Sequence, residues 1–287
     1  MPVPSSGIVS ALRSVLAGRP GKIMQDGFLE PRHYANKINR RFISEDFSVR
    51  PMFSKTDGNG AATGATGDVN LMRTNRGQYE WHVKGAGQTI LVPAYDATTG
   101  KGLDFAQDQA STEGHELAFS PNIVTSGGDR GAGAYKVGTD DAFFARLQIL
   151  SSDWSGVGTL FFGVRKPQAY ATALATYTDY AGFKVVNSGA LGAVKIETNL
   201  AGAGAVLVDT TQTIADNVAA VFEIRVKKDG TVFFRFNDGA PTVGVSGFVF
   251  AAGTILIPVS FFLHSADLAD NLWYQQFDTA YLPQKAA

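Results

Sequence analysis

From Tyr79 to the C-terminus, apolar and polar residues alternate in short runs separated by glycine-rich turns. A period of two residues is typical of β-strands that bury one face. The clearest case is residues 219–236, where every second position is apolar on both sides of Asp229-Gly230. An Asp-Gly pair between two alternating runs is a strong signal for a hairpin turn. We therefore expect a β-hairpin over this segment.

The same pattern predicts roughly a dozen strands, too many for a seven-stranded immunoglobulin-type sandwich. It favours an all-β fold, a two-sheet antiparallel jelly-roll sandwich. Within this part, a helix is expected only at Pro167–Tyr177, which has Pro at the first helical position and is rich in alanine. The expected strands are residues 79–83, 88–92, 115–120, 142–150, 159–165, 182–187, 194–200, 205–209, 248–250, 254–263 and 272–277, besides the hairpin.

The first part of the chain differs in pattern. Residues 6–17 carry one apolar stripe at helical spacing and predict a short helix, which Gly18 and Pro20 end. Residues 19–56 show no regular period, but aromatic residues recur along them, which indicates an extended arm with anchors. We expect residues 1–56 to form the helix and assembly arm, 57–78 a glycine-rich linker, and 79–287 the sandwich.

The anchors could pack on the same molecule or on a neighbouring subunit, and the sequence leaves both open. The expected assembly residues are Leu12, Val15, Leu16, Phe28, Tyr34, Arg40, Arg41, Phe42 and Phe47. Residues 1–50 hold eight basic and four acidic side chains, although the whole chain has a net charge of −1. A basic segment on a mildly acidic body is a common layout for an assembly arm.

Composition excludes several kinds of chemistry. The chain has no cysteine, so it has no disulfide, thiolate metal site or thiol nucleophile. No apolar stretch reaches the roughly 18 residues that span a bilayer, and no signal peptide is evident. We therefore expect no membrane partner, and assembly in a host cytoplasm fits the lack of cysteine. Contact with nucleic acid is not expected, because the basic residues of the arm are diluted and interrupted by acids.

No catalytic or metal-binding pattern emerges from the sequence. There is no G-x-S-x-G nucleophile motif and no phosphate-binding loop. The four histidines show no metal-ligand spacing, and His82 and His264 are interpreted as strand-surface and strand-end residues. The acidic residues Glu113, Glu116, Glu197 and Glu223 are interpreted as exposed. We therefore expect no catalytic residue, no metal and no cofactor.

Two segments resemble known families. Residues 194–239, with an amphipathic strand, an Asp-Gly turn and a strand closing on Asn237-Asp238-Gly239, resemble the second half of concanavalin-like and laminin-G-like jelly rolls. The tail from Ile257 to Trp273 resembles tailed-phage virion proteins in which a sandwich follows an N-terminal arm. The second resemblance implies a virion structural protein of the capsid cement or decoration type.

The sequence is compatible with three functions. The main expectation is a non-enzymatic virion subunit whose arm binds copies of itself or the major capsid protein. The alternative is a carbohydrate-binding sandwich of a phage tail or fibre, and the third is a glycan-cleaving enzyme, which needs two adjacent carboxylates. The rings that could stack on a glycan are Trp81, Trp154, Tyr170, Tyr177, Tyr180, Trp273 and Tyr274.

Overall fold

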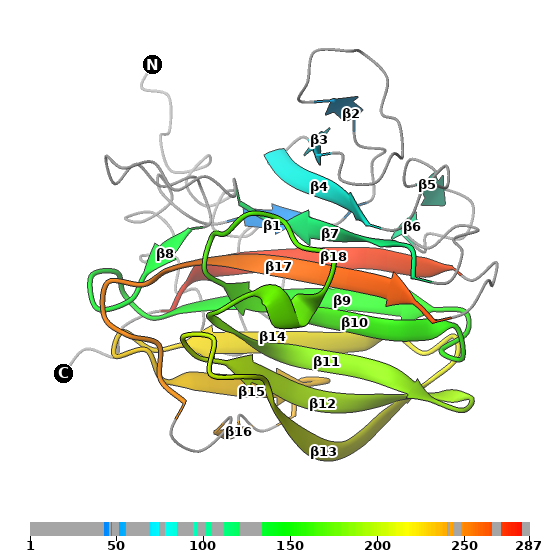
Figure 1. Cartoon of the computed structure of the whole chain (residues 1–287). Coiled ribbons are helices and arrows are strands. Elements are labelled where there is room, and N and C mark those ends of the chain that lie inside the picture. The colour runs from blue at the N-terminus through cyan, green and yellow to red at the C-terminus, as the bar shows by residue number, and fades with distance from the viewer. Residues whose placement is uncertain are drawn as a thin grey trace, which may run out of the picture.

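The described chain folds into two antiparallel β-sheets that face each other (Figure 1). In this computed structural model the smaller sheet has eight strands and the larger has ten. The residues that the structure describes are 43–45, 47, 52–55, 69–74, 78–84, 94–96, 102–104, 112–120, 134–239, 242–243, 248–265 and 271–282.

The eight-stranded sheet is built around the long strands β9 and β18. In spatial order its strands are β16 (Thr242–Val243), β15 (Val232–Phe236), β14 (Ala220–Val226), β9 (Phe143–Ser151), β18 (Leu272–Tyr281), β6 (Gly102–Asp104) and β5 (Ala94–Asp96), with β1 (Ile43–Glu45) also paired to β18.

The ten-stranded sheet is built around β10 and β17. In spatial order its strands are β13 (Val206–Ala215), β12 (Leu191–Asn199), β11 (Tyr180–Ser188), β10 (Val157–Arg165), β17 (Ile255–His264), β7 (Gly114–Ala118), β4 (Gln78–Lys84), β3 (Val69–Arg73) and β2 (Met52–Lys55), with β8 (Tyr135–Lys136) also paired to β17.

The connections between the sheets make this a jelly roll. The chain runs from β9 in one sheet through β10 to β13 in the other, then returns through β14 to β16. The last two strands enter the middle of the sheets, β17 between β10 and β7, and β18 between β9 and β6. The expected fold class, an all-β two-sheet antiparallel jelly-roll sandwich, is therefore confirmed.

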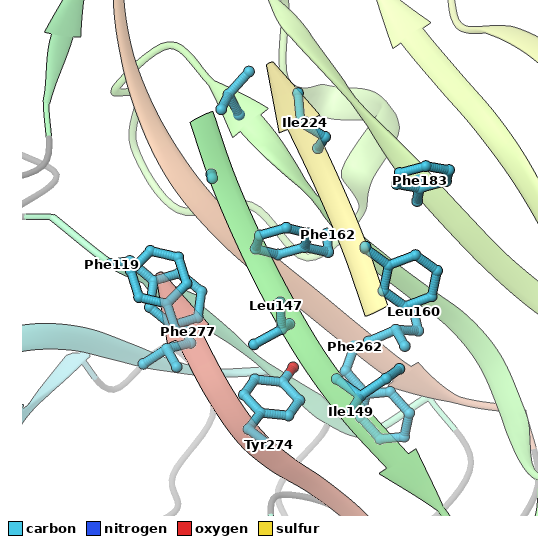
Figure 2. Close-up of a cluster of buried hydrophobic side chains, with 14 of the residues drawn as sticks. Phe119, Leu147, Ile149, Leu160, Phe162, Phe183, Ile224, Phe262, Tyr274 and Phe277 are labelled. Atoms are coloured by element: carbon cyan, nitrogen blue, oxygen red, sulfur yellow. The ribbon is translucent and has the colours of Figure 1, made fainter. Parts of the chain in front are cut away.

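The core lies between the sheets and is rich in aromatic rings (Figure 2). Phe119 stacks on Phe277 with ring centroids 3.7 Å apart, and both rings are fully buried. Strand β9 shows why the sequence pattern succeeds, since its buried and half-buried residues alternate over the second half of the strand. Burying one such apolar side chain contributes about 1.5–3 kcal/mol to the stability of the fold. A strand with apolar residues at every second position is therefore most stable with that face in the core.

The predicted hairpin is confirmed. Phe222 pairs with Phe236 and Val226 with Val232, so β14 and β15 are joined through the Asp229-Gly230 turn. Gly230 has a φ of 89°, and a Cβ there would lie 2.1 Å from the carbonyl oxygen of Phe250. Only glycine combines that dihedral with such a close backbone approach.

The helix expected at Pro167–Tyr177 is wrong. The segment contains only a 3₁₀ turn, η1 (Leu174–Thr176), and otherwise runs as a loop over the outer face of the ten-stranded sheet (Figure 1). Threonine and tyrosine residues interrupt its alanines and have weaker helix propensity. The loop instead uses Tyr170 and Tyr177 to reach carboxylates on the sheet, which outweighs local preference.

Strands β1, β2 and β3 precede residue 79 and pair within the two sheets. The sandwich thus includes segments on both sides of the expected linker, while the division at residues 56 and 78 stays a prediction. The helix expected at residues 6–17 lies outside the described residues, as does the strand expected at 88–92. Residues 248–250 contribute only an isolated bridge between Val249 and Thr231.

Candidate functional site

The outer face of the ten-stranded sheet holds a buried charged cluster. Glu116 on β7 lies opposite His82 on the neighbouring strand β4. Lys84 follows two positions along β4 on the same face, and Arg165 ends β10. Lys84, Glu116 and Arg165 are each fully buried. Strand pairing therefore brings together three charged groups that are far apart in the sequence.

The carboxylate of Glu116 forms ion pairs with both Lys84 and Arg165. Lys84 Nζ lies 2.9 Å from Glu116 Oε2, and Arg165 Nε lies 2.8 Å from Glu116 Oε1. The hydroxyl of Tyr177 donates a hydrogen bond of 2.5 Å to Glu116 Oε2. Burial by itself raises the pKa of Glu116, but the charges of Arg165 and Lys84 outweigh it and leave the pKa below its ordinary value. Glu116 therefore remains ionised at neutral pH.

The loop of residues 166–179 closes over this cluster. Tyr170 donates a hydrogen bond of 2.7 Å to Glu80 Oε2, and its ring stacks on His82 with centroids 4.4 Å apart. Burial, together with the charge of Glu116, raises the pKa of Tyr177 well above its usual range. Tyr177 therefore stays protonated and donates to Glu116, while its oxygen accepts a hydrogen bond of 3.0 Å from the Ala171 amide. Together with the bond from Tyr170 to Glu80, these contacts fasten the loop to the sheet.

The interpretation of the acidic residues as exposed is wrong for all four. Glu116 is fully buried, and Glu113, Glu197 and Glu223 are 3–5% exposed. His82 and His264 are also buried, at 6% and 2% exposed, so His82 does not lie on an open sheet surface. The sequence shows which residues share a strand face, but it does not show that a loop covers that face.

The aromatic residues expected to stack on a glycan do not form an exposed row. Tyr170 is half-buried against His82. The other six are buried, with exposed fractions of 3% or less: Trp81, Trp154, Tyr177, Tyr180, Trp273 and Tyr274. This expectation is wrong, because six of the rings are buried and the seventh is held against His82.

A different set of rings forms an open cavity at one edge of the sandwich. The cavity has a volume of about 270 Å³ and lies where β11, β12 and β13 of one sheet face β15 of the other. Its lining consists of Phe183, Ile196, Thr210, Gln212, Phe234, Phe236 and Gly239.

Aromatic packing holds the apolar floor of this cavity in place. Phe183 and Phe234 meet edge to face with centroids 5.5 Å apart, and both are at most 2% exposed. Phe236 lies 6.3 Å from Phe183 and 5.6 Å from Phe222, and it is half-buried. Phe183 is among the labelled core rings of Figure 2. The cavity is therefore a continuation of the core that opens toward solvent at Phe236.

A bulge in β13 shapes the other wall. Val194 pairs with Gln212 and Lys195 with Asp209, so the strand register skips Thr210 and Thr211. Thr211 has a φ of 60°, a region that a β-branched residue rarely occupies. Local hydrogen bonds maintain this geometry, including one of 2.8 Å from the Thr211 amide to Asp209 Oδ1. Backbone strain of this kind concentrates at ligand-binding sites.

The polar groups of the cavity come from this bulge and from the turn after β15. The Thr210 hydroxyl donates to the carbonyl of Val194 and accepts from the Gln212 amide at 3.2 Å. The Gln212 side chain is exposed, and its carboxamide can both donate and accept. The lining, all of it drawn from described residues, holds no charged side chain. Such a cavity suits a small uncharged ligand that has an apolar face and hydroxyl groups.

Of the expected assembly residues, the structure places only Phe47. Phe47 is fully buried in the core between the sheets, so this anchor packs within its own molecule. The other eight lie outside the described residues: Leu12, Val15, Leu16, Phe28, Tyr34, Arg40, Arg41 and Phe42. Their role in assembly stays a prediction.

Within the described ranges, no three His, Cys, Asp or Glu residues gather in a way that could hold a metal ion. In the same part of the chain, no helix has the length and apolar character needed to cross a membrane.

No protein-family model matches this chain, and neither does any curated protein. Among solved structures, the carbohydrate recognition domain of Emp47p is 13% identical, with a TM-score of 0.46 over 71% of this chain and 89% of that one. A legume lectin-like domain from Entamoeba histolytica is 10% identical, with a TM-score of 0.46 over 71% and 90%. An alginate lyase from Pseudomonas aeruginosa is 8% identical, with a TM-score of 0.45 over 83% and 100%. Since these scores lie below 0.5, we assign the fold from the strand pairing of this chain and not from these similarities.

Proposed function

We propose that this protein is a non-catalytic carbohydrate-binding domain that holds one sugar residue in the cavity between β13 and β15. The observation that carries the proposal is the open, uncharged, aromatic-floored cavity beside the strained bulge at Thr211. Small-molecule sites are concave, mostly apolar and carry a few polar groups that fix orientation. This cavity has each of these features.

The chemistry of the lining matches a sugar ring. One face of a pyranose presents C–H groups, which pack on the electron-rich faces of aromatic rings such as Phe236. Its hydroxyls need partners that both donate and accept, and the carboxamide of Gln212 supplies both. At about 270 Å³ the cavity is slightly smaller than the roughly 300–1,000 Å³ of drug-sized sites, which favours a single terminal residue over a chain segment.

The other candidate functions have less support. A glycan-cleaving role needs reachable acid and base groups, whereas Glu116 is ion-paired and covered by a loop. A role as a capsid cement subunit, a virion location and a capsid partner remain predictions of the sequence.

The test is a glycan array with full-length protein, followed by titration of the strongest glycan. Phe236→Ala removes the ring at the mouth of the cavity and should weaken binding at least tenfold, which corresponds to about 1.4 kcal/mol. Phe233→Ala is the matched control. It lies on the same strand and is also half-buried, but it points to the other face, where Lys227 Nζ lies 4.6 Å from its ring centroid.

The proposal predicts that Phe233→Ala binds like the unmodified protein and that Gln212→Ala is weakened. An array without any bound glycan would overturn the proposal, and so would a Phe236→Ala variant with unchanged affinity.

A further inference from the structure

Strand β13 is an unusual edge. It pairs with β12 on one side and with no other described strand on the other. Among the described residues, the other strands at the ends of the two sheets are shorter: β2 has four residues, β5 three and β16 two, whereas β13 has ten. Short edge strands limit pairing with other chains, but a long edge offers a row of backbone donors and acceptors.

The side chains on this edge are apolar where they should be charged if the strand were protected. Val206, Leu207 and Val208 are 48%, 47% and 40% exposed. They account for three of the six large hydrophobic residues that are exposed in the described part of the chain. Edges that avoid association carry lysine, proline or a bulge. Residues 206–208 have no such feature, and the bulge of β13 begins only after Asp209.

We propose that β13 pairs antiparallel with β13 of a second copy, which joins the two ten-stranded sheets into one continuous sheet. Symmetry restricts the register of such a pair. Hydrogen-bonded and non-hydrogen-bonded residue pairs alternate along antiparallel strands. The two-fold axis must therefore lie midway between one residue and the same residue of the second copy.

An axis at Leu207 gives the best match. Leu207 then faces Leu207 of the second copy. Val206 of each copy faces Val208 of the other. Asp209 faces Ala205, so no two like charges are opposed, which is a condition for stable cross-strand pairing. An axis at Val208 would instead set Leu207 against Asp209. The sequence of this edge is thus self-complementary in one register.

The charged residue next to the predicted axis, Glu197, is also compatible with this pairing. Leu207 lies beside Glu197 in the register between β13 and β12. Glu197 is 3% exposed and is paired with Lys184 at 2.5 Å, and it accepts a hydrogen bond of 2.7 Å from Tyr180. No unbalanced carboxylate therefore lies next to the predicted axis.

The pairing would place the cavities of both copies next to the dimer interface, because Thr210 and Gln212, which line the cavity, lie on β13 itself. A bivalent advantage in glycan binding would rest on the proposed function, but the pairing does not. A contact limited to residues 205–209 of each copy falls among small interfaces, below about 1,200 Å². We therefore expect a weak dimer whose mass rises with concentration.

The test uses the absence of cysteine from the chain. Leu207→Cys places a thiol on the axis, where directly opposed Cα atoms lie about 4.5–5.5 Å apart, within the range that a disulfide spans. Val206→Cys is the matched control with nearly the same exposure, but it faces position 208 of the second copy and not itself. Both are made in the full-length protein and oxidised under identical conditions.

We expect the unmodified protein to show a concentration-dependent dimer by sedimentation. We also expect Leu207→Cys to form covalent dimers roughly ten times faster than Val206→Cys, since the paired strands raise the effective thiol concentration. The double variant Val206→Cys, Val208→Cys should cross-link like Leu207→Cys.

A monomer at every concentration tested would overturn the proposal. Equal cross-linking of Leu207→Cys and Val206→Cys would also overturn it, since random collision predicts equal rates for equally exposed thiols. None of these readouts uses a sugar, so failure of the pairing and failure of glycan binding are distinguished.

Discussion

Replacing Glu116 by glutamine should strongly destabilise the sandwich. The change keeps the size of the side chain but removes the carboxylate that pairs with both Lys84 and Arg165. All three residues are fully buried. Removing one partner of a buried ion pair costs about 3–5 kcal/mol, because the remaining charge is left without compensation. With two cations affected, we expect a loss in the upper part of that range.

The assay is urea unfolding followed by tryptophan fluorescence, which reports on the buried Trp81 and Trp154. Asp238→Asn is the control, since Asp238 pairs with Arg146 at 3.1 Å but the side chains are 22% and 11% exposed. A partly exposed pair is worth less than a fully buried one, and pairs at the surface contribute about 0.2–1 kcal/mol. If Glu116→Gln loses no more unfolding free energy than Asp238→Asn, the buried ion pairs do not stabilise the sandwich.

A second substitution tests the cause of the loss. Lys84→Met removes one buried cation, so adding it to Glu116→Gln should recover part of the lost unfolding free energy. In the unmodified protein Lys84→Met should instead be destabilising, because it breaks a satisfied buried pair. A double-mutant cycle measures this coupling directly. Purely additive effects would contradict an electrostatic origin.

Two further predictions concern pH and packing. Burial holds the pKa of His115 well below 6.5, so the unfolded chain takes up a proton first as pH falls, and unfolding free energy should drop below pH 6.5 by up to about 1.4 kcal/mol per pH unit. His115→Gln should flatten that slope in urea unfolding at several pH values, and an unchanged slope would exclude His115 as its source. Gly182→Ala would set a Cβ 2.4 Å from the ring of Phe161 and 2.5 Å from the carbonyl oxygen of Phe162. It should lower stability by about 1–3 kcal/mol, and a melting temperature equal to that of the unmodified protein would contradict this.

The sequence predicts the sandwich well because alternation is a local signal. The hairpin at Asp229-Gly230 follows from turn chemistry and two-residue periodicity, and its register agrees with the pattern. The helix expected at Pro167–Tyr177 is wrong for a reason that no local pattern contains. Tyr170 and Tyr177 bond to Glu80 and Glu116, which lie 90 and 61 residues earlier in the chain.

The candidate cavity could be predicted only in part. Alternation in β15 sets Phe234 and Phe236 on the inward face, so two of its rings follow from the sequence. The wall formed by Thr210 and Gln212 depends on a bulge that extends β13 beyond Asp209, where the expected strand ends. A threonine in the left-handed region has no sequence signature, since threonine ordinarily disfavours that conformation. The opening of the cavity is therefore a property of tertiary structure.

The most direct test of the carbohydrate-binding proposal is to map the bound sugar by NMR. Isotope-labelled full-length protein is titrated with the strongest glycan from the array, and amide shifts are followed at increasing ligand concentration. We expect the largest changes at Thr210, Gln212 and Phe236, around the cavity. Changes confined to the loop of residues 166–179, with none at these three positions, would contradict the proposal.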